Sequence, residues 1–181
     1  MNTLEPTKEE LRALEVFRSR DTTRPGIARV WVYRTEDGVS HVATDGHTLA
    51  LRRAGSHRTM SPDAVGKLSL CDVGTDTARP PQWWHCIKVP WLEGKSPLAQ
   101  HGINVTYLAR IALIEAAAAK RSASELVREP RESQKVFRAR KVHARRYFAV
   151  WTIPADAFDG WYYKLDTPAC LWEGIIMPRR V

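Results

Sequence analysis

The sequence predicts an α+β protein in which a helix followed by antiparallel strands occurs twice. Three observations predict this class: a helix-capping pattern near the start of the chain, a second helix-forming stretch in its middle, and period-two alternation of apolar residues after each helix. The order helix, strands, connection, helix, strands indicates a duplicated helix-plus-antiparallel-sheet unit. Because neither half would bury its sheet alone, we expect residues 1–181 to fold as a single domain.

The first helix is predicted by a capping box. Thr7 stands three residues before Glu10, so each side chain can satisfy a free backbone N–H at a helix start. One apolar stripe, which is expected to face the core, is then formed by Leu11, Leu14 and Phe17, with Ala13 and Val16 beside them. The helix should end before Arg24-Pro25-Gly26, because proline and glycine interrupt helices.

The rest of the first half, residues 27–53, is predicted to form two or three antiparallel strands. Apolar residues alternate there at period two, which is typical of half-buried strands. Turns are indicated at Glu36-Asp37-Gly38 and at Asp45-Gly46, because these residue types favour tight hairpin loops. The first half of the duplicated unit therefore covers residues 1–53.

Residues 54–102 are predicted to form a long connection, because the sequence loses its periodicity there and gathers prolines and glycines. Short strands are expected at residues 67–73 and 84–89. The tryptophans of this connection could stack on nucleic-acid bases, but packing in a core or at a subunit contact is the favoured interpretation. They are Trp83, Trp84 and Trp91.

The second half, residues 103–181, begins with the strongest helix pattern of the sequence. Asn104 is a good N-cap, and a helix is expected from Val105 to about Arg121. The spacing of Ser122 and Glu125 repeats the capping box and indicates a short further helix. Strands are then expected at Lys135–His143, Arg146–Ile153, Trp161–Leu165 and Leu171–Met177.

The composition favours a polyanionic partner. Lys and Arg number 28 against 20 Asp and Glu, and the formal net charge of +8 attracts nucleic acid or an anionic membrane surface. No apolar run approaches the roughly 20 residues of a membrane span, and the first residues lack the regions of a signal peptide. The three cysteines show no zinc-ligand spacing, so we expect reduced thiols in a cytoplasmic protein without metal or cofactor.

Three short segments carry a resemblance to a known family. Residues 41–50 read His-Val-Ala-Thr-Asp-Gly-His-Thr-Leu-Ala, residues 103–108 read Ile-Asn-Val-Thr-Tyr-Leu, and residues 174–181 read Gly-Ile-Ile-Met-Pro-Arg-Arg-Val. They are similar, in this order, to Ala-Thr-Asp-Gly-His-Arg-Leu-Ala, Phe-Asn-Val-Ser-Tyr-Val and Tyr-Val-Val-Met-Pro-Met-Arg-Leu of the bacterial DNA polymerase III beta sliding clamp. Thr48 replaces the usual arginine of the first segment, and Arg179 replaces an apolar residue of the last.

The resemblance implies a DNA-clamp-like fold in a shortened, single-domain form. A clamp subunit contains three such domains and two subunits close a ring, so six copies of this chain would be needed, and a homo-oligomer is expected. The implied function is that of a processivity or scaffold protein on double-stranded DNA, which it contacts non-specifically, while short linear motifs of DNA polymerase or repair proteins bind to it. The alternative is a clamp-like module that forms no ring and regulates replication or repair by occupying partner peptides or DNA.

The resemblance also implies a peptide pocket, bordered in the family by the Asp45-Gly46 loop and the C-terminal segment. Thr48 and Arg179 depart from the family's pattern at this site. The alternative from the residues alone is that the apolar members are strand core and that the loop is a plain hairpin turn. Carried over by position, the candidates are Thr44, Gly46, His47, Thr48, Leu49, Ile176, Met177 and Pro178.

In the family, the helices face DNA and contact phosphates without reading bases, which long cationic side chains can do without fixed geometry. A solvated charged face is the alternative interpretation for the cation-rich run between residues 120 and 146. The candidate DNA contacts are Lys8, Arg12 and Arg18 in and after the first helix, Arg110, Lys120 and Arg121 in the second, and Arg138 and Arg140 on an expected strand.

No catalytic constellation is recognised, so an enzyme is not expected. His41, Asp45 and His47 lie close in sequence, and His85 adjoins Cys86. However, no third metal ligand, Gly-rich phosphate loop or paired-carboxylate pattern accompanies them. The sequence therefore favours a binding protein over a hydrolase or a metalloenzyme.

Overall fold

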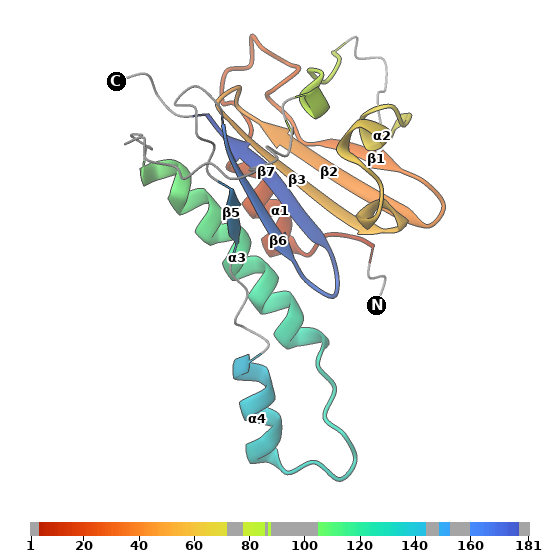
Figure 1. Ribbon diagram of the computed structural model, residues 1–181, viewed down its shortest axis with the longest axis vertical. Helices are drawn as coiled ribbons and strands as arrows, with labels where there is room; N and C mark the ends of the chain where they lie inside the picture. The colour runs from red at the N-terminus through yellow and green to blue at the C-terminus, as the bar shows by residue number, and fades with distance from the viewer. Residues whose placement is uncertain are drawn as a thin grey trace, which may run out of the picture.

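Figure 1 shows the computed structural model, which describes residues 4–71, 78–85, 87, 105–143, 149–152 and 160–177. Within these residues the protein has a mixed α+β architecture, which confirms the predicted class. The helices are α1 (Lys8–Glu15), α2 (Pro62–Gly66), α3 (Val105–Glu125) and α4 (Gln134–His143), with short 3-10 helices η1 (Ser56–Arg58) and η2 (Trp83–His85). The strands are β1 (Trp31–Arg34), β2 (Gly38–Thr44), β3 (Thr48–Gly55), β4 (Leu70–Cys71), β5 (Val150–Thr152), β6 (Trp161–Asp166) and β7 (Leu171–Ile176).

The strands of the described chain form one antiparallel sheet in the order β4-β1-β2-β3-β7-β6-β5. Strands β1 to β3 are neighbours in both sequence and space, and so are β5 to β7. The two groups join where β3 pairs with β7, with Thr48 opposite Ile176 and Arg53 opposite Leu171. Each group follows a helix in the chain, α1 before β1 and α3 before β5.

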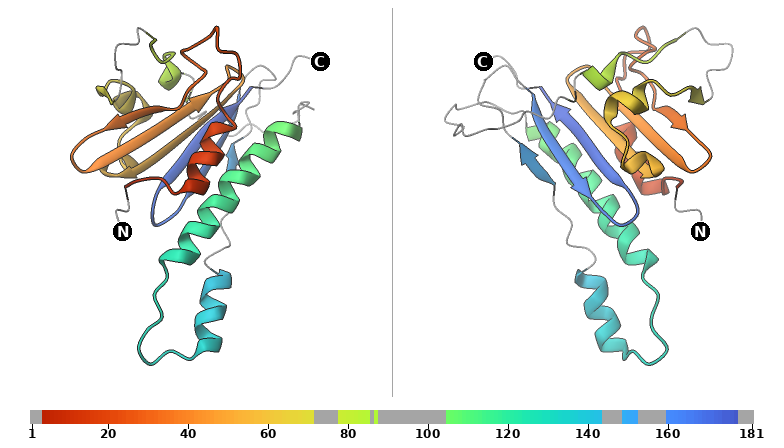
Figure 2. Two further views of the ribbon diagram at one scale, coloured as in Figure 1. Left: turned by 180° about the vertical axis from the view of Figure 1, so that it is seen from behind. Right: turned by 45° about the vertical axis from the view of Figure 1, so that its right-hand side comes forward.

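Both faces of the sheet are covered. α1 and α3 lie side by side on one face, termed the helix side, and α2 and η2 lie on the other, termed the connection side (Figure 2). Along β2, Ala43 joins the helix-side core while its neighbour Val42 joins the connection-side core. All 7 residues of β2 are therefore buried, where a half-exposed strand would bury every second one.

The capping box that starts α1 is confirmed. The backbone N–H of Thr7 donates to Glu10 Oε2 at 2.8 Å, and the backbone N–H of Glu10 donates to Thr7 Oγ1 at 3.2 Å. Leu14 and Phe17 are fully buried, as the stripe predicts, but Leu11 and Val16 are 40% and 37% exposed, so the predicted stripe is wider than the face that packs on the core. The helix itself ends at Glu15, well before the predicted limit.

The strand expected at residues 135–143 is wrong, because this segment forms helix α4. It combines good helix formers such as Arg138 and Lys141 with Ser133, whose hydroxyl accepts from the backbone N–H of Val136 at 3.3 Å in the manner of an N-cap. Arg138 and Arg140 therefore lie on a helix, where the sequence predicted a strand face. The two valines of this helix, Val136 and Val142, are exposed.

Two further expectations need correction. In residues 67–73 only Leu70–Cys71 is a strand within the described chain, and Trp83–His85 is a 3-10 helix where a strand was expected to begin. α3 runs without a break to Glu125, so Ser122 does not start a second helix but is buried inside α3.

The C-terminal part of α3 and the whole of α4 extend beyond the sheet as an arm (Figure 1). None of the described residues of α4 is buried. Among the described residues, no helix has the length and apolar character that a membrane crossing would require.

Candidate functional site

Two of the segments that carry the family resemblance, residues 41–50 and 174–177, meet at one end of the sheet, and α3, which begins within the third segment, reaches the same place through Arg110. Thr48 of the β2–β3 hairpin pairs with Ile176 of β7, and the backbone N–H of Met177 donates to His47 O at 2.8 Å. Arg110, near the start of α3, donates through Nη1 to the Thr48 hydroxyl at 2.7 Å. Residues 44–49, residues 107–110 and residues 175–177 thus form one contiguous region, termed here the hairpin site.

The turn of the hairpin site is fixed by its own side chains. Asp45 Oδ1 accepts from the backbone N–H of His47 at 2.9 Å and from that of Thr48 at 2.8 Å. The Thr44 hydroxyl donates to Thr48 O at 2.7 Å and accepts from the Gly46 N–H at 3.0 Å. Gly46 has a φ of 91°, a conformation that L side chains rarely adopt. The Asp45-Gly46 turn that the sequence predicts is therefore present and rigidly held.

Arg110 ties α3 to this turn. Its Nη1 also lies 2.5 Å from Asp45 Oδ2, and its guanidinium lies over the rings of Tyr107 and Phe17, 5.1 Å and 5.9 Å from their centres. Burial alone would raise the pKa of Asp45, but the hydrogen bonds from Arg110 and the backbone lower it below its ordinary value. Asp45 is thus ionised, and Arg110, predicted to contact DNA, is engaged inside the protein.

The candidate peptide-contacting residues differ in accessibility. Thr44, Thr48, Leu49 and Ile176 are buried, with exposed fractions of 7%, 1%, 4% and 0%. For these four residues the structure supports the strand-core interpretation. The accessible members are Gly46, His47 and Met177, the last being 39% exposed, while Pro178 lies outside the described residues.

Arg121 was predicted to contact DNA, and its burial contradicts this role. Its side chain is 4% exposed, and its Nη1 donates to Glu10 Oε2 at 2.7 Å while its Nε donates to Glu125 Oε1 at 2.8 Å. A buried arginine with these partners cannot reach a phosphate without breaking them. Its position on the inner face of α3 explains the error, because helical spacing places it with the buried Ala117 and Ala118.

Two other predicted DNA contacts are also paired with acids. Lys120 on α3 forms an ion pair with Glu9 on α1. Arg140 on the arm forms ion pairs with Glu129 at 3.2 Å and with Glu132 at 2.8 Å. The remaining predicted cations are exposed: Lys8, Arg12, Arg18 and Arg138. They lie on α1, just after it, and on α4, so they belong to two separate parts of the molecule (Figure 2).

The outer surface of the helix layer is more apolar than the resemblance implies. Leu11, Leu108 and Leu113 are 40%, 40% and 48% exposed. A groove of about 320 Å³ runs between α1 and α3, with Val16 and Leu113 among the residues that line it. A face that follows DNA phosphates is expected to be cationic. The exposed cations Lys8 and Arg12 of α1 therefore stand beside an apolar surface formed by leucines of α1 and α3.

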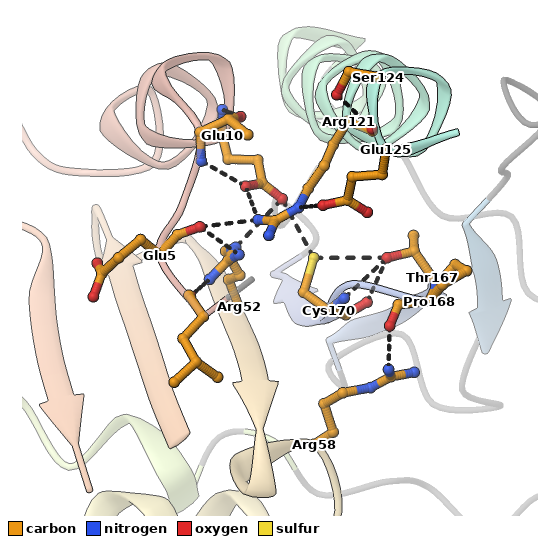
Figure 3. A network of polar contacts seen from close by, with 12 residues as sticks. Glu5, Glu10, Arg52, Arg58, Arg121, Ser124, Glu125, Thr167, Pro168 and Cys170 are labelled. Carbon is orange, nitrogen blue, oxygen red and sulfur yellow. Dashed lines mark hydrogen bonds and ion pairs between the residues drawn. The ribbon is translucent and has the colours of Figure 1, made fainter. Parts of the chain in front are cut away.

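A buried polar network that the sequence did not predict lies beneath the helices (Figure 3). Glu10 is fully buried, with Arg121 on one side and Arg52 Nε 3.4 Å from its Oε1 on the other. The Cys170 thiol donates to the same Oε1 at 3.3 Å. Burial would raise the pKa of Glu10, but the two arginines lower it. The available signal was spacing, because Glu10 precedes Leu14 and Phe17 on the buried stripe by four and seven residues.

Several of the groups that suggest chemistry are buried, while His47 and His85 are exposed. Ser40 Oγ lies 2.8 Å from His57 Nδ1, but both residues are fully buried, so no substrate could reach them. Burial also raises the pKa of the Cys170 thiol to about 11, which leaves it protonated and unreactive. His41 is buried while His47 is exposed, so the two do not share a site.

Among the residues that the structure describes, no group of three or more His, Cys, Asp or Glu side chains is arranged to hold a metal ion. No known family, no curated protein and no solved structure matches this chain.

Proposed function

We propose that the protein is a clamp-like binding module that holds short linear motifs of replication or repair proteins at the hairpin site. The observation that carries this proposal is that segments resembling the beta sliding clamp come together at one end of the sheet. Residues 41–50 and 174–177 are joined by strand pairing and a hydrogen bond, and Arg110, two residues after the third segment, donates from α3 to the Thr48 hydroxyl. The order of α1 before β1 to β3, and of α3 and α4 before β5 to β7, supports a clamp-like duplicated unit.

Arg110 supports the proposal at the point where the sequence departs from the family. The clamp segment carries an arginine where this chain has Thr48. Here Arg110 reaches the Thr48 hydroxyl from α3 and brings a guanidinium to the same hairpin. Its side chain is 25% exposed, so part of this cation remains open to a partner. Arg110 thereby supplies the type of group that the substitution at position 48 removed.

A module without a ring is favoured over a closed processivity ring. In a ring, the helix layer would line the channel and face DNA. Of the cations predicted for that face, Arg121 is buried and Arg110 and Lys120 pair with carboxylates, while leucines occupy part of the exposed surface. DNA association would then rest on the exposed Lys8, Arg12, Arg18 and Arg138. The ring of six copies remains the second candidate, because the chain resembles a single clamp domain.

Peptide binding tests the hairpin site directly. A fluorescent peptide carrying the linear motif with which bacterial polymerases bind their clamp is titrated with the protein, and binding is measured by fluorescence anisotropy. Met177→Glu places a charge beside the exposed apolar surface and is expected to weaken binding at least about tenfold. Val127→Glu, on a residue that is 80% exposed and lies on the arm, is the matched control and should change nothing. The proposal fails if the unaltered protein does not bind the peptide or if both variants behave alike.

The solution mass separates the two forms of the proposal. Light scattering at several concentrations, with and without circular DNA, is expected to show a monomer or dimer throughout. A hexamer that is retained on circles and released when they are cut would support the ring instead. Either outcome is independent of peptide binding at the hairpin site.

A further inference from the structure

A second cavity lies on the connection side of the sheet, away from the hairpin site. It has a volume of about 550 Å³, and its lining includes Tyr33 of β1, Lys67, Arg79, Gln82 and Trp84. This volume lies within the usual range for small-molecule sites. The cavity is therefore large enough for a ligand with an aromatic ring and a polar substituent.

The aromatic wall of this cavity is held in place by a chain of ring contacts. Trp83 Nε1 donates to the Tyr33 hydroxyl at 2.9 Å, and Trp83 meets Trp84 edge to face, with 5.7 Å between ring centres and 87° between ring planes. Trp84 also lies directly against Gly66, where a Cβ would come within 2.2 Å of its ring. Only glycine permits this approach, so the absence of a side chain at position 66 determines the position of the half-buried Trp84 indole.

The polar side chains around the cavity are cationic or neutral. Arg79 and Gln82 are exposed, and Lys67 pairs at 2.6 Å with Asp63 while both remain more than half exposed, at 69% and 52%. An ion pair this exposed is weak, so Lys67 can turn to another anion at little cost. No carboxylate is among the described residues that line the cavity. An aromatic wall beside two cations and an amide suits a flat ring that carries a negative charge.

We propose that this cavity binds a nucleobase that carries a phosphate. The base packs against Trp84, since indoles stack on all bases, and Gln82 offers both a donor and an acceptor to the base edge. Arg79 and Lys67 neutralise the phosphate. The same chemistry is present in a free nucleotide and in one residue of a single-stranded nucleic acid. This site is separate from the hairpin site and does not depend on the function proposed there.

The test measures binding of a fluorescein-labelled oligothymidine by anisotropy and of dTMP by calorimetry, both at low salt. Trp84→Leu keeps an apolar side chain but removes the aromatic surface, and it should weaken binding about tenfold or more. Arg79→Gln removes one positive charge from the cavity and should weaken binding several-fold. Lys164→Gln is the matched control. It removes one charge from an exposed position on β6, next to the edge strand β5 and far across the sheet from β1.

Loss of binding in both cavity variants, with the control unchanged, supports the proposal. Tight binding of dTMP identifies a nucleotide site, whereas binding of the oligomer alone identifies a single-strand site. If neither probe binds, or if binding is insensitive to both cavity variants, the proposal is overturned. If Trp84→Leu fails to fold, as judged by circular dichroism, the surface variant Arg79→Gln decides. Retention of peptide binding by the cavity variants separates this result from the hairpin site.

Discussion

The two faces of the sheet bury charge in different ways, and the adjacent residues Arg52 and Arg53 of β3 show the difference. Arg52 points to the helix side, where Glu10 lies between it and Arg121. Arg53 points to the connection side, where it pairs with Glu173. On the helix side two buried arginines share Glu10, and Arg121 also pairs with Glu125, whereas on the connection side Glu173 serves a single arginine.

Neutral partners surround the ion pairs on both faces. Arg53 also donates to the backbone carbonyls of His57 and Met60, and the Tyr162 hydroxyl donates to Glu173 at 2.6 Å. On the helix side, Arg52 donates to the backbone carbonyls of Leu4 and Glu5, and Arg121 donates to that of Glu5. The difference that remains is that two buried arginines share Glu10, whereas Glu173 serves one. Loss of the Glu10 carboxylate should therefore lower the free energy of unfolding more than loss of the Glu173 carboxylate.

The buried histidines of the two faces differ in how completely their ring nitrogens are hydrogen-bonded. On the connection side, both ring nitrogens of His57 have hydroxyl partners, Ser40 at 2.8 Å and Thr35 at 3.0 Å. On the helix side, His41 Nδ1 has no hydrogen-bond partner within the described residues. Burial, reinforced by the charge of Arg52, lowers the pKa of His41 from 6.5 to about 4. The helix side thus holds a histidine that cannot accept a proton without disrupting its surroundings.

The largest expected effect is that of Glu10→Gln. Glutamine keeps the size of the side chain and can still accept from the Thr7 N–H, so the change isolates the charge. Leaving two buried arginines without this carboxylate should lower the free energy of unfolding by about 3–5 kcal/mol. Urea denaturation followed by circular dichroism measures the loss. Glu173→Gln is the matched variant on the connection side and should cost less, so an equal or larger loss for Glu173→Gln would reverse the comparison.

The second prediction concerns pH and His41. Above pH 6.5 the imidazole is neutral in both the folded and the unfolded chain, so its full contribution is present. Below pH 6.5 the unfolded chain binds a proton at His41 that the folded protein does not bind. The free energy of unfolding therefore falls until the pH reaches about 4. Between about pH 7 and about pH 5 the free energy of unfolding should decrease by about 2 kcal/mol from this residue.

His41→Leu is the control for this pH dependence. It removes the titrating group while keeping an apolar side chain at a position that is 4% exposed. The difference in unfolding free energy between the two proteins, measured at each pH, isolates His41 from His57, whose pKa burial also lowers. Parallel pH profiles for the two proteins would show that His41 does not titrate in this way.

A smaller effect is expected from Tyr162→Phe on the connection side. The change removes one hydrogen bond to Glu173, which retains Arg53 as its charged partner. The unfolding free energy should fall by about 1–2 kcal/mol, the usual contribution of a hydrogen bond to a buried charged group. Thermal unfolding of the two proteins at neutral pH checks this value, and a loss as large as that of Glu10→Gln would mean that the tyrosine is essential to the pair.

The smallest effect is expected on the arm. Arg140 pairs with Glu129 and Glu132 but is itself 37% exposed. Exposed ion pairs contribute about 0–1 kcal/mol, so Arg140→Ala should change the unfolding free energy by less than about 1 kcal/mol. The same denaturation experiment measures it. A loss of several kcal/mol would place the arm among the elements that hold the fold together.

Sequence patterns predicted the elements whose signals are local. The capping box at Thr7 and the turn at Asp45-Gly46 depend on residues a few positions apart, and both are present. The strands of β2 and β3 were recognised from period-two spacing. Residues 135–143 were wrongly predicted as a strand, although their helix formers and the N-cap at Ser133 are local signals for helix α4.

The candidate sites were predictable only in part, because they depend on partners distant in sequence. Arg110 and Arg121 were predicted as surface cations, and nothing near either residue indicates that Asp45 or Glu10 would pair with it. Arg52 and Arg53 stand next to each other in a strand, which normally exposes one of the two. Both are buried because the sheet is covered on both faces, on the connection side by described residues 56–71, 78–85 and 87, which include Val65 and Trp83.

The pairing of β3 with β7 also has a consequence for how the chain reaches its fold. β7 is the last strand of the described chain, yet it occupies an interior place in the sheet between β3 and β6. While the chain is being synthesised, β3 therefore presents an open edge with unpaired backbone groups until residues 171–176 leave the ribosome. The nascent N-terminal half is expected to need protection during that interval, and such long-range closure makes folding slow.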